Sequence, residues 1–547
     1  MKLCLQIYFT IILWIGILFG ERTVHILPFD WSGQNGLISV YGQLFWNQDW
    51  MSGPLYFDGT FSNYPFRYGS SYLESFQPVN FNEIPSHESL PDSNMVTNSF
   101  DYRKGDYLFD QLDIKADFGD ESHLLRINGF KRTYAGTFGE YVQPEEILTP
   151  NQQSYRLDYL STSELEKVYA STAHFVTNSG LPDSSMNGHH KNITTTAGIL
   201  YTKIIGDNTL DLYSSQFNQE RSITHSSQDS TLSSFINRTH IHMKWTTKTS
   251  KSIGVIADNQ IILYNELRDL QWATIYGGLN GKRLITSLGG SFLSKGNSYA
   301  LYLKSSFLLQ GKSWKMNSGL SYSTKPIHIA LMDTTQFFET WSRVYLNIEK
   351  TISSFQFQSA NNLGSLTHSS PGSNSNYLSS ELSMLWEIFS KCTVLGMVGV
   401  YETLWNNLPL VGSTPLTDGF RRKIQFSING SQPFFNGNMM IHTMLRVNGN
   451  LNREQNYGYD FMNAIPILDE NPTIILPDYW VIHFEFSAVV SNVTFTWQIQ
   501  NVLNAYESPA KKIFPNLNND YLWIQNNRDF SPMGQLISFN VLWNFEN

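Results

Sequence analysis

The chain has 547 residues, a formal net charge of −9 at pH 7 and a sequence pI near 5.8. This acidic balance excludes the basic footprint of a nucleic-acid-binding protein. The mean hydropathy of −0.25 excludes a bundle of membrane helices, since each helical span needs about 20 predominantly apolar residues. Charged residues make up only 15% of the chain and aromatic residues 14%, a mixture that favours a membrane β-barrel with an apolar belt and a polar lumen.

Residues 1–20 are typical of a secretory signal peptide. Lys2 supplies the positive start, and the segment from Ile7 to Phe19 is an almost unbroken apolar run. We expect cleavage near Gly20. Because Leu18 stands where a small residue is usual, an uncleaved helical anchor is the alternative.

Residues 21–100 have weak periodicity and are rich in Gly, Pro, Ser and aromatic residues. The prolines spaced from Pro54 to Pro91 argue against a continuous sheet. We therefore expect an N-terminal extension over residues 21–100 that lies in the periplasm or in the lumen, followed by a barrel over residues 101–547.

From Asp101 onward, short runs alternate between apolar and polar residues and are separated by turns or long loops, with loops expected at 180–191 and 218–233. A period of two places one set of side chains toward lipid and the other toward the lumen. The ionisable members of the second set are predicted to line the lumen wall: Asp113, Lys115, Asp117, Arg126, Lys304, Arg446 and Glu485.

A soluble β-sandwich also alternates, so the period alone leaves that fold open. The apolar faces here are unusually aromatic, whereas the inner faces of sandwiches pack mainly aliphatic side chains. We therefore predict an all-β, antiparallel transmembrane barrel. Residues 101–547 have room for roughly 16 to 22 strands, and an even number is expected.

The last strand carries the sharpest signal, a strict row of five bulky apolar residues: Ile537, Phe539, Val541, Trp543 and Phe545. This row resembles the terminal assembly signal of outer-membrane proteins, although Glu546 and Asn547 follow the final aromatic residue. The resemblance implies that the barrel-assembly machinery and outer-membrane lipid are partners of the chain.

Residues 493–547 resemble the closing hairpin of TonB-dependent receptors and related porins. The resemblance rests on a second apolar row in Val493–Ile499, on the stretch Asn501–Tyr506 and on Pro532–Gln535 before the last strand. It implies a barrel of 22 strands in a bacterial outer membrane. The segment 21–100 is shorter than the plug domain of that family, and Glu21–His25 resembles a TonB box only faintly, so a TonB-type energising partner is not implied.

Catalytic and metal-binding motifs are missing from the sequence. There is no Gly-x-Ser-x-Gly, no His-Glu-x-x-His and no phosphate-binding glycine loop. The pair His189–His190 is expected in a polar loop without further ligands, and a single cysteine, Cys392, remains outside the signal segment. We therefore expect no enzyme activity, cofactor or metal site.

Three functions remain open on the sequence alone. The leading hypothesis is passage of an unidentified solute across the outer membrane, either as a porin or as a receptor-like barrel without a plug. The second is a surface adhesin or structural barrel that residues 21–100 close. The third, an outer-membrane hydrolase, requires a Ser or Asp and a histidine gathered at one rim.

Overall fold

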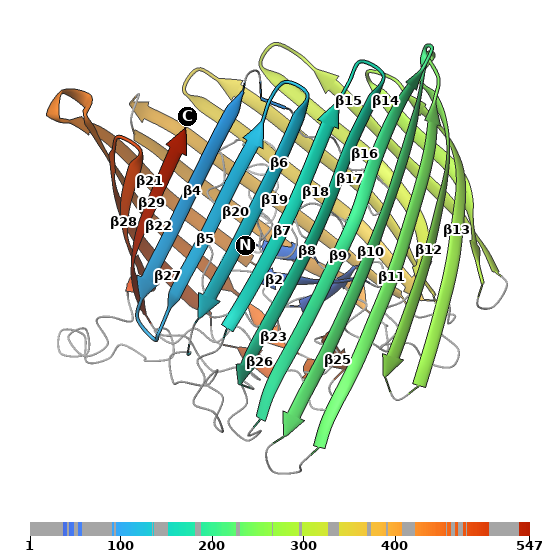
Figure 1. Ribbon diagram of the computed structural model, residues 1–547, viewed down its shortest axis with the longest axis horizontal. Coiled ribbons are helices and arrows are strands. Elements are labelled where there is room, and N and C mark those ends of the chain that lie inside the picture. The colour runs from blue at the N-terminus through green and yellow to red at the C-terminus, as the bar shows by residue number, and fades with distance from the viewer. Residues whose placement is uncertain are drawn as a thin grey trace, which may run out of the picture.

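The computed structural model is one closed antiparallel barrel of 22 strands (Figure 1). Each strand pairs with its neighbours in the chain, and the ring closes where β29 pairs with β4, with Val541 opposite Tyr102. The predicted all-β barrel and the strand number implied by the resemblance are both confirmed.

The structure describes residues 37–40, 43–48, 53–56, 90–91, 94–133, 135, 151–180, 188–225, 230–264, 266–294, 298–326, 338–368, 374–389, 392–406, 422–455, 457–460, 465–468, 474–476, 478–502 and 535–546. The first half of the barrel consists of β4 (Met95–Gly105), β5 (Asp110–Gly119), β6 (His123–Thr133), β7 (Asn151–Thr162), β8 (Glu166–Gly180), β9 (Gly188–Ile205), β10 (Asn208–His225), β11 (Ser230–Thr246), β12 (Lys251–Tyr264), β13 (Glu266–Asn280) and β14 (Leu284–Leu293). The second half consists of β15 (Ser298–Gln310), β16 (Trp314–Pro326), β17 (Phe338–Ile352), β18 (Phe355–His368), β19 (Asn374–Phe389), β20 (Cys392–Asn406), β21 (Arg422–Phe434), β22 (Met439–Leu451), β27 (Tyr479–Val490), β28 (Val493–Gln500) and β29 (Leu536–Glu546).

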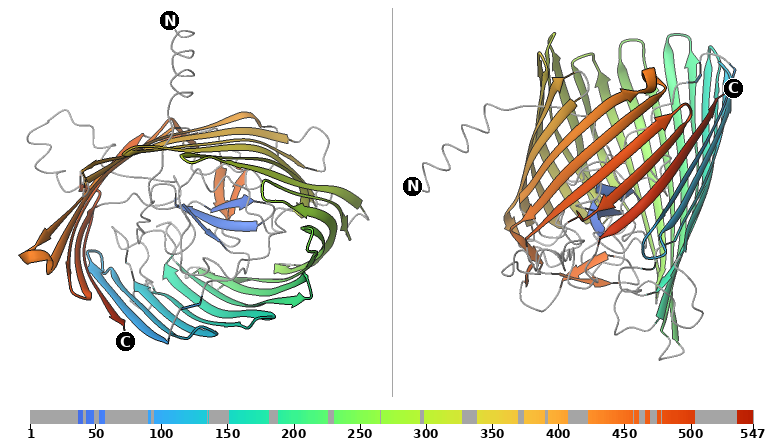
Figure 2. Two further views of the ribbon diagram at one scale, coloured as in Figure 1. Left: turned by 90° about the horizontal axis from the view of Figure 1, so that it is seen from above. Right: turned by 90° about the vertical axis from the view of Figure 1, so that its left-hand side faces the viewer.

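Outside the barrel, the short elements are β1 (Leu37–Val40), β2 (Gln43–Gln48), β3 (Gly53–Tyr56), β23 (Arg453–Gln455), β24 (Tyr457–Asp460), β25 (Ile465–Leu468), β26 (Ile474–Leu476) and the 3-10 turn η4 (Phe435–Gly437). The sheet β1–β2–β3 lies within the ring of barrel strands when the molecule is seen from above (Figure 2), and β1 is in contact with β25. Within the described ranges, no helix is long and apolar enough to cross a membrane. The first barrel strand begins at Met95, ahead of the start expected near residue 101.

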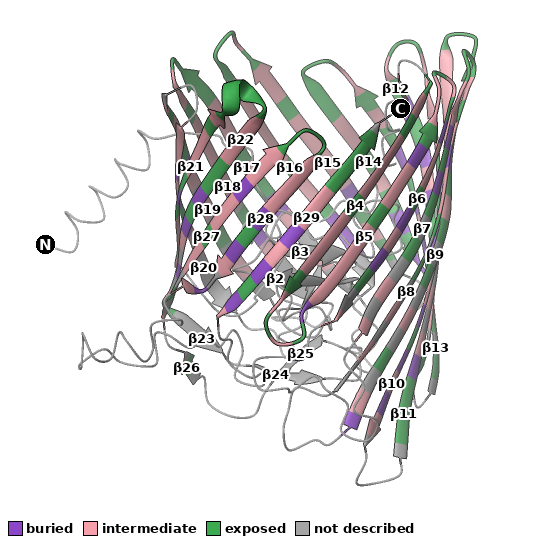
Figure 3. Cartoon of the chain, turned by 60° about the vertical axis from the view of Figure 1, so that its left-hand side comes forward, coloured by how far each residue is buried: buried purple, intermediate pink, exposed green. Residues whose placement is uncertain are grey.

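On many barrel strands, exposed positions alternate with more covered ones among the described residues (Figure 3), and the exposed positions include many large apolar residues. On β13, for example, Ile275 is 60% exposed, whereas its neighbours Thr274 and Tyr276 are buried. Successive side chains of a strand point to opposite faces, so the exposed apolar residues form a belt on the outside of the barrel. On β29, the belt includes Ile537, Trp543 and Phe545.

The two rims differ in the length of their connections. Short turns such as 206–207 and 353–354 lie at one rim, whereas the long connections 452–478 and 501–535 lie at the other. β29 ends at the short-turn rim, because Glu546 pairs with Thr97 near the start of β4. Short turns mark the periplasmic side of outer-membrane barrels, and so this rim is the periplasmic one.

The turn between β5 and β6 shows how the sequence fixes such a connection. Asp120 accepts hydrogen bonds at 2.7–2.8 Å from the backbone amides of Ser122 and His123 and from the Ser122 hydroxyl. These bonds stabilise the ionised carboxylate and lower the pKa of Asp120 to about 2. The turn places β6 in the register that pairs Asp117 with Arg126.

One glycine on the inner wall of β12 and one on the inner wall of β14 stand in close contact with Tyr276 of β13. A Cβ on Gly254 would overlap the ring of Tyr276, and one on Gly289 would overlap the Tyr276 backbone. The Tyr276 ring therefore reaches across β12, where its hydroxyl shares a 2.7 Å hydrogen bond with Nε2 of His242 on β11. The Tyr302 ring packs against it from β15.

We predict that Gly254→Ala displaces the Tyr276 ring and breaks its hydrogen bond to His242. Overpacking of this kind costs about 1–3 kcal/mol. Gly396→Ala is the matched control, because a Cβ there meets open space. Denaturant unfolding in phospholipid vesicles compares the two, and an equal effect of both substitutions would contradict the role given to Gly254.

Candidate functional site

A charged group with several partners on the inner wall is Asp117 of β5. Its Oδ1 accepts a hydrogen bond from Nε of Arg126 at 3.1 Å, and its Oδ2 accepts one from Nη2 at 3.3 Å. Nζ of Lys115 lies 3.0 Å from Oδ2. The Asp117 side chain is 4% exposed, whereas Lys115 is 35% exposed and faces the lumen. The Lys115 ammonium is therefore accessible from the lumen, whereas the Asp117 carboxylate is buried.

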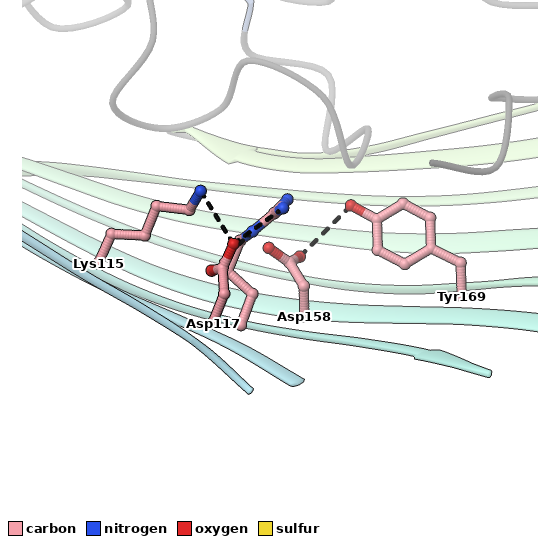
Figure 4. A network of polar contacts seen from close by, with 5 residues as sticks. Lys115, Asp117, Asp158 and Tyr169 are labelled. Atoms are coloured by element: carbon pink, nitrogen blue, oxygen red, sulfur yellow. Dashed lines mark hydrogen bonds and ion pairs between the residues drawn. The ribbon is translucent and has the colours of Figure 1, made fainter. Parts of the chain in front are cut away.

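The same row of the sheet continues onto β7 and β8. Arg126 stands opposite both Asp117 and Asp158 in the strand register. The hydroxyl of Tyr169 donates a hydrogen bond to Oδ1 of Asp158 at 3.4 Å. Figure 4 shows Lys115, Asp117, Asp158 and Tyr169 rising from the same face of the strands. Anionic and cationic groups thus alternate from strand to strand along this part of the wall.

A second polar network lies on β22, β27 and β28. Oε2 of Glu485 accepts a hydrogen bond from Nε2 of Gln498 at 2.6 Å, and Oε1 accepts one from the Ser487 hydroxyl at 3.4 Å. Arg446 stands opposite His483, two positions from Glu485 along β27. Arg446 and Glu485, which the sequence predicts as wall residues, therefore lie in one cluster.

The other two predicted wall residues are Lys304 and Asp113. Lys304 on β15 pairs with Ser321 of β16, which in turn pairs with Arg343 of β17, so the two cations lie in one row of the sheet. Asp113 stands opposite Phe130. The structure thus groups Lys115, Asp117 and Arg126 in one network and Arg446 and Glu485 in another. A role of the seven residues toward a solute stays a prediction.

A buried apolar cluster on the inner wall was not predicted from the sequence. Its members follow one another in the strand register from β6 to β10: Leu124, Leu160, Tyr169, Leu200 and Tyr213. Leu90 and Met95 pack against this cluster. Alternation assigns these side chains to the inner face, but only the structure shows that they meet and that Leu90 and the first residue of β4 pack against them.

The buried pair His240 and Asp258 is also absent from the sequence prediction. Nδ1 of His240 lies 2.8 Å from Oδ1 of Asp258, and both side chains are at most 5% exposed. Ser215 stands opposite His240 in the register, but Nε2 of His240 has no hydrogen-bond partner. A nucleophilic serine must be hydrogen-bonded to its base, so this row gives the hydrolase hypothesis no engaged nucleophile. The sequence signal was the spacing of His240 and His242 on one strand face.

The loop expected around His189 and His190 is wrong, because both residues belong to β9. The loop expected at 218–233 is also wrong over most of its length, since β10 runs to His225 and β11 begins at Ser230. Among the described residues, no three His, Cys, Asp or Glu side chains are grouped as metal ligands.

Solved structures with this barrel architecture are found among outer-membrane transporters. The FrpB iron transporter from Neisseria meningitidis (F5-1 variant) matches with a TM-score of 0.62 and 11% sequence identity, over 83% of this chain and 83% of that chain. The siderophore receptor PirA from Acinetobacter baumannii matches with a TM-score of 0.60 and 6% identity, over 84% and 81%. The chain has the barrel fold of TonB-dependent receptors.

The ferric yersiniabactin uptake receptor FyuA from Yersinia pestis extends this comparison, with a TM-score of 0.57 and 11% identity over 83% of this chain and 80% of that chain. No family model matches the sequence, and no curated protein does. The likeness therefore concerns the fold, which is that of a bacterial outer-membrane barrel.

Proposed function

We propose that the chain mediates the passage of a solute across the bacterial outer membrane, as a porin-like or receptor-like barrel without a full plug domain. The observation that carries the proposal is a closed ring with an apolar exterior and paired charges such as Asp117 and Arg126 on its inner wall. Charged groups in the lumen of a barrel set the field that a passing solute meets.

We infer the class of solute from the proteins that share the fold. Those proteins are described as an iron transporter, a siderophore receptor and a copper transporter. A metal ion or a metal chelate is accordingly the first solute class to test. The proposed activity is transport without chemical conversion, with the seven predicted wall residues as the groups that the solute meets.

A closed structural or adhesive barrel is the second candidate, and a specific observation favours it. The sheet β1–β2–β3 lies within the ring in Figure 2, where it would narrow a path through the lumen. Deletion of residues 37–56 removes this sheet and leaves every hydrogen-bonded pair of barrel strands in place. The deletion variant is therefore a matched control for the full chain.

Conductance in planar phospholipid bilayers separates these functions. Discrete current steps from the full chain are the expected result for an open solute path. Steps from the deletion variant alone would support the closed barrel. If both proteins are folded and neither gives steps, passive solute passage is contradicted, and binding of metal ions or chelates to the full chain decides whether a receptor-like role survives.

A further inference from the structure

A group of polar side chains interrupts the lipid-facing surface of β9 to β13. On these strands the outer face is set by alternation, because intervening residues such as Tyr213 and His240 are buried on the inner face. We name the outward-facing group the polar island; it comprises Thr195, Gln216, Asn218, Asn237, Thr239, Asn259, Asp269 and Gln271.

The polar island occupies two adjacent rows of the sheet. In one row, Gln216, Thr239, Asn259 and Gln271 face one another in register from β10 to β13. The next row joins Thr195, Asn218 and Asn237, passes through the apolar Ile261 of β12 and ends at Asp269. The island is therefore a compact patch on neighbouring strands, in the region at the front of Figure 1 where β9, β10 and β11 run side by side.

Apolar side chains border the island on both sides along β11, β12 and β13, whereas on β10 the outward residue next to Asn218 toward the long-loop rim is the charged Glu220. Toward the short-turn rim lie exposed apolar residues that include Ile241, Met243 and Ile275. Toward the long-loop rim lie Leu263 and Leu267, the second of which is 68% exposed. Polar groups bordered on both sides by exposed apolar groups lie inside the lipid belt rather than beyond its edge.

The aromatic residues of β11 also indicate that the polar island lies within the apolar band of the membrane. Trp245 and Phe235 both face outward; Trp245 lies between the island and the short-turn rim, and Phe235 lies between the island and the long-loop rim. The two residues are 10 positions apart, which along a strand tilted by about 40° spans about 25 Å, the height of the apolar band between the two aromatic girdles. Thr239 and Asn237 lie between these two levels, and hydrocarbon would surround them in an isolated barrel.

Hydrogen bonds within the island satisfy only part of its polar groups. Nδ2 of Asn237 donates to Oδ1 of Asn218 at 2.5 Å, and the Thr239 hydroxyl donates to Oε1 of Gln216 at 2.7 Å. Longer bonds join Nε2 of Gln216 to Oδ1 of Asn218 at 3.5 Å and Nε2 of Gln271 to Oδ2 of Asp269 at 3.3 Å. The Thr195 hydroxyl shares a hydrogen bond of 3.0 Å with Nδ1 of His174 on β8. Oδ1 of Asn259 has no hydrogen-bond partner. Each primary amide carries two donor hydrogens and an acceptor oxygen, so these contacts leave hydrogen-bonding capacity that lipid tails cannot meet. Polar groups inside a membrane are costly unless another protein surface satisfies them.

We propose that the polar island is a lateral interface that binds a second copy of this chain, related by a two-fold axis along the membrane normal. In such an interface the same patch meets itself, so every donor must find an acceptor on an identical surface. Amide side chains meet this condition, because each of them both donates and accepts hydrogen bonds. A two-fold axis along the membrane normal also keeps both barrels in the same orientation.

Charge and shape next to the island support this choice of partner. Lys191 and Glu220 are both exposed on the outer face, so a two-fold copy can set the cation of one barrel near the anion of the other. The surface is hollowed at the same place, in a pocket lined by Lys191, Glu220, Phe235 and Leu263 among others. A patch with both signs of charge and a hollow suits a copy of itself better than a uniformly charged partner.

Disulfide cross-linking in intact outer membranes tests the contact. The chain used carries Cys4→Ser and Cys392→Ser and has one new cysteine, Asn237→Cys in the island. The matched control is Trp497→Cys, on the lipid face of β28 and outside the island. A dimer of twice the single-chain mass should form under oxidation with Asn237→Cys and not with Trp497→Cys. No dimer, equal amounts of dimer from both, or a product with a different protein would overturn the proposal.

Replacing polar residues of the island by apolar ones tests whether the island holds two copies of the chain together. The variant combines Gln216→Leu, Asn218→Leu, Asn237→Leu and Thr239→Val. In mild detergent we expect the unaltered chain to be a dimer and the variant to be a folded monomer. Heat-modifiable migration in gels verifies folding, and light scattering gives the mass. A folded variant that remains dimeric would contradict the interface. If the variant fails to fold, the cross-linking result still decides, and neither outcome depends on whether the barrel conducts.

Discussion

Phe539→Arg is expected to lower the free energy of unfolding of the barrel by about 2–4 kcal/mol, the cost of a cation near the bilayer midplane. Phe539 is on the outer face near the middle of β29, where its ring packs against Trp497 at 4.8 Å and Phe495 at 6.3 Å between ring centroids. Arginine at this position would lose both aromatic contacts and place a guanidinium in hydrocarbon. Guanidinium unfolding in phospholipid vesicles, followed by tryptophan fluorescence, measures the change.

The control substitution must be at an inward-facing residue of β29 that has room for an arginine. Ser538 is the neighbouring inward residue, but it is only 3% exposed, so an arginine there would clash with the packed wall. Asn544 lies on the same inner face and is exposed. Asn544→Arg should therefore be tolerated far better than Phe539→Arg, and equal destabilisation by the two would show that the faces of β29 are assigned wrongly.

Asp117→Ala is expected to cost about 3 kcal/mol, at the lower end of the range for removing one partner of a buried ion pair. The Asp117 side chain is 4% exposed and Arg126 is 17% exposed, so loss of the carboxylate leaves a guanidinium with little access to water. Lys115 contributes less to this cost because it is more exposed. Denaturant unfolding in vesicles again provides the measurement.

A double-mutant cycle with Arg126→Ala tests whether the pair itself is responsible. The double variant should be less destabilised than the sum of the two single variants, because each single variant already loses the whole Asp117–Arg126 interaction. The exposed pair Lys248 and Asp207 serves as the comparison, and removing Asp207 should change stability little. Strict additivity of Asp117→Ala and Arg126→Ala would refute a coupled pair.

Where alternation was strict, the sequence predicted the fold well. The row from Ile537 to Phe545 became the outer face of β29, and the Asp120 turn placed Arg126 beside Asp117. Strand length was less predictable. The polar regions around His189 and Asn218 are predicted as loops from the sequence, whereas in the structure they extend β9 and β10 on the side away from the short turns.

Long-range contacts on the inner wall could not be predicted for a physical reason. A period of two assigns a face to each residue but does not say which residue of the next strand stands opposite. The pairs His240 with Asp258 and Tyr276 with His242 depend on that register and on the gap that Gly254 leaves. The same holds for the polar island, whose two rows are aligned only once β10 to β13 are paired.

The most direct test of the membrane-barrel assignment is a spin-label scan along β29 in phospholipid vesicles, one nitroxide at a time from Ile537 to Phe545. Collision with oxygen, which concentrates in the hydrocarbon, should be high at the odd-numbered positions and low at the even-numbered ones. Uniformly low oxygen contact at Phe539, Val541 and Trp543 would mean that protein instead of lipid covers this face, and the barrel would then not be a membrane-spanning transporter.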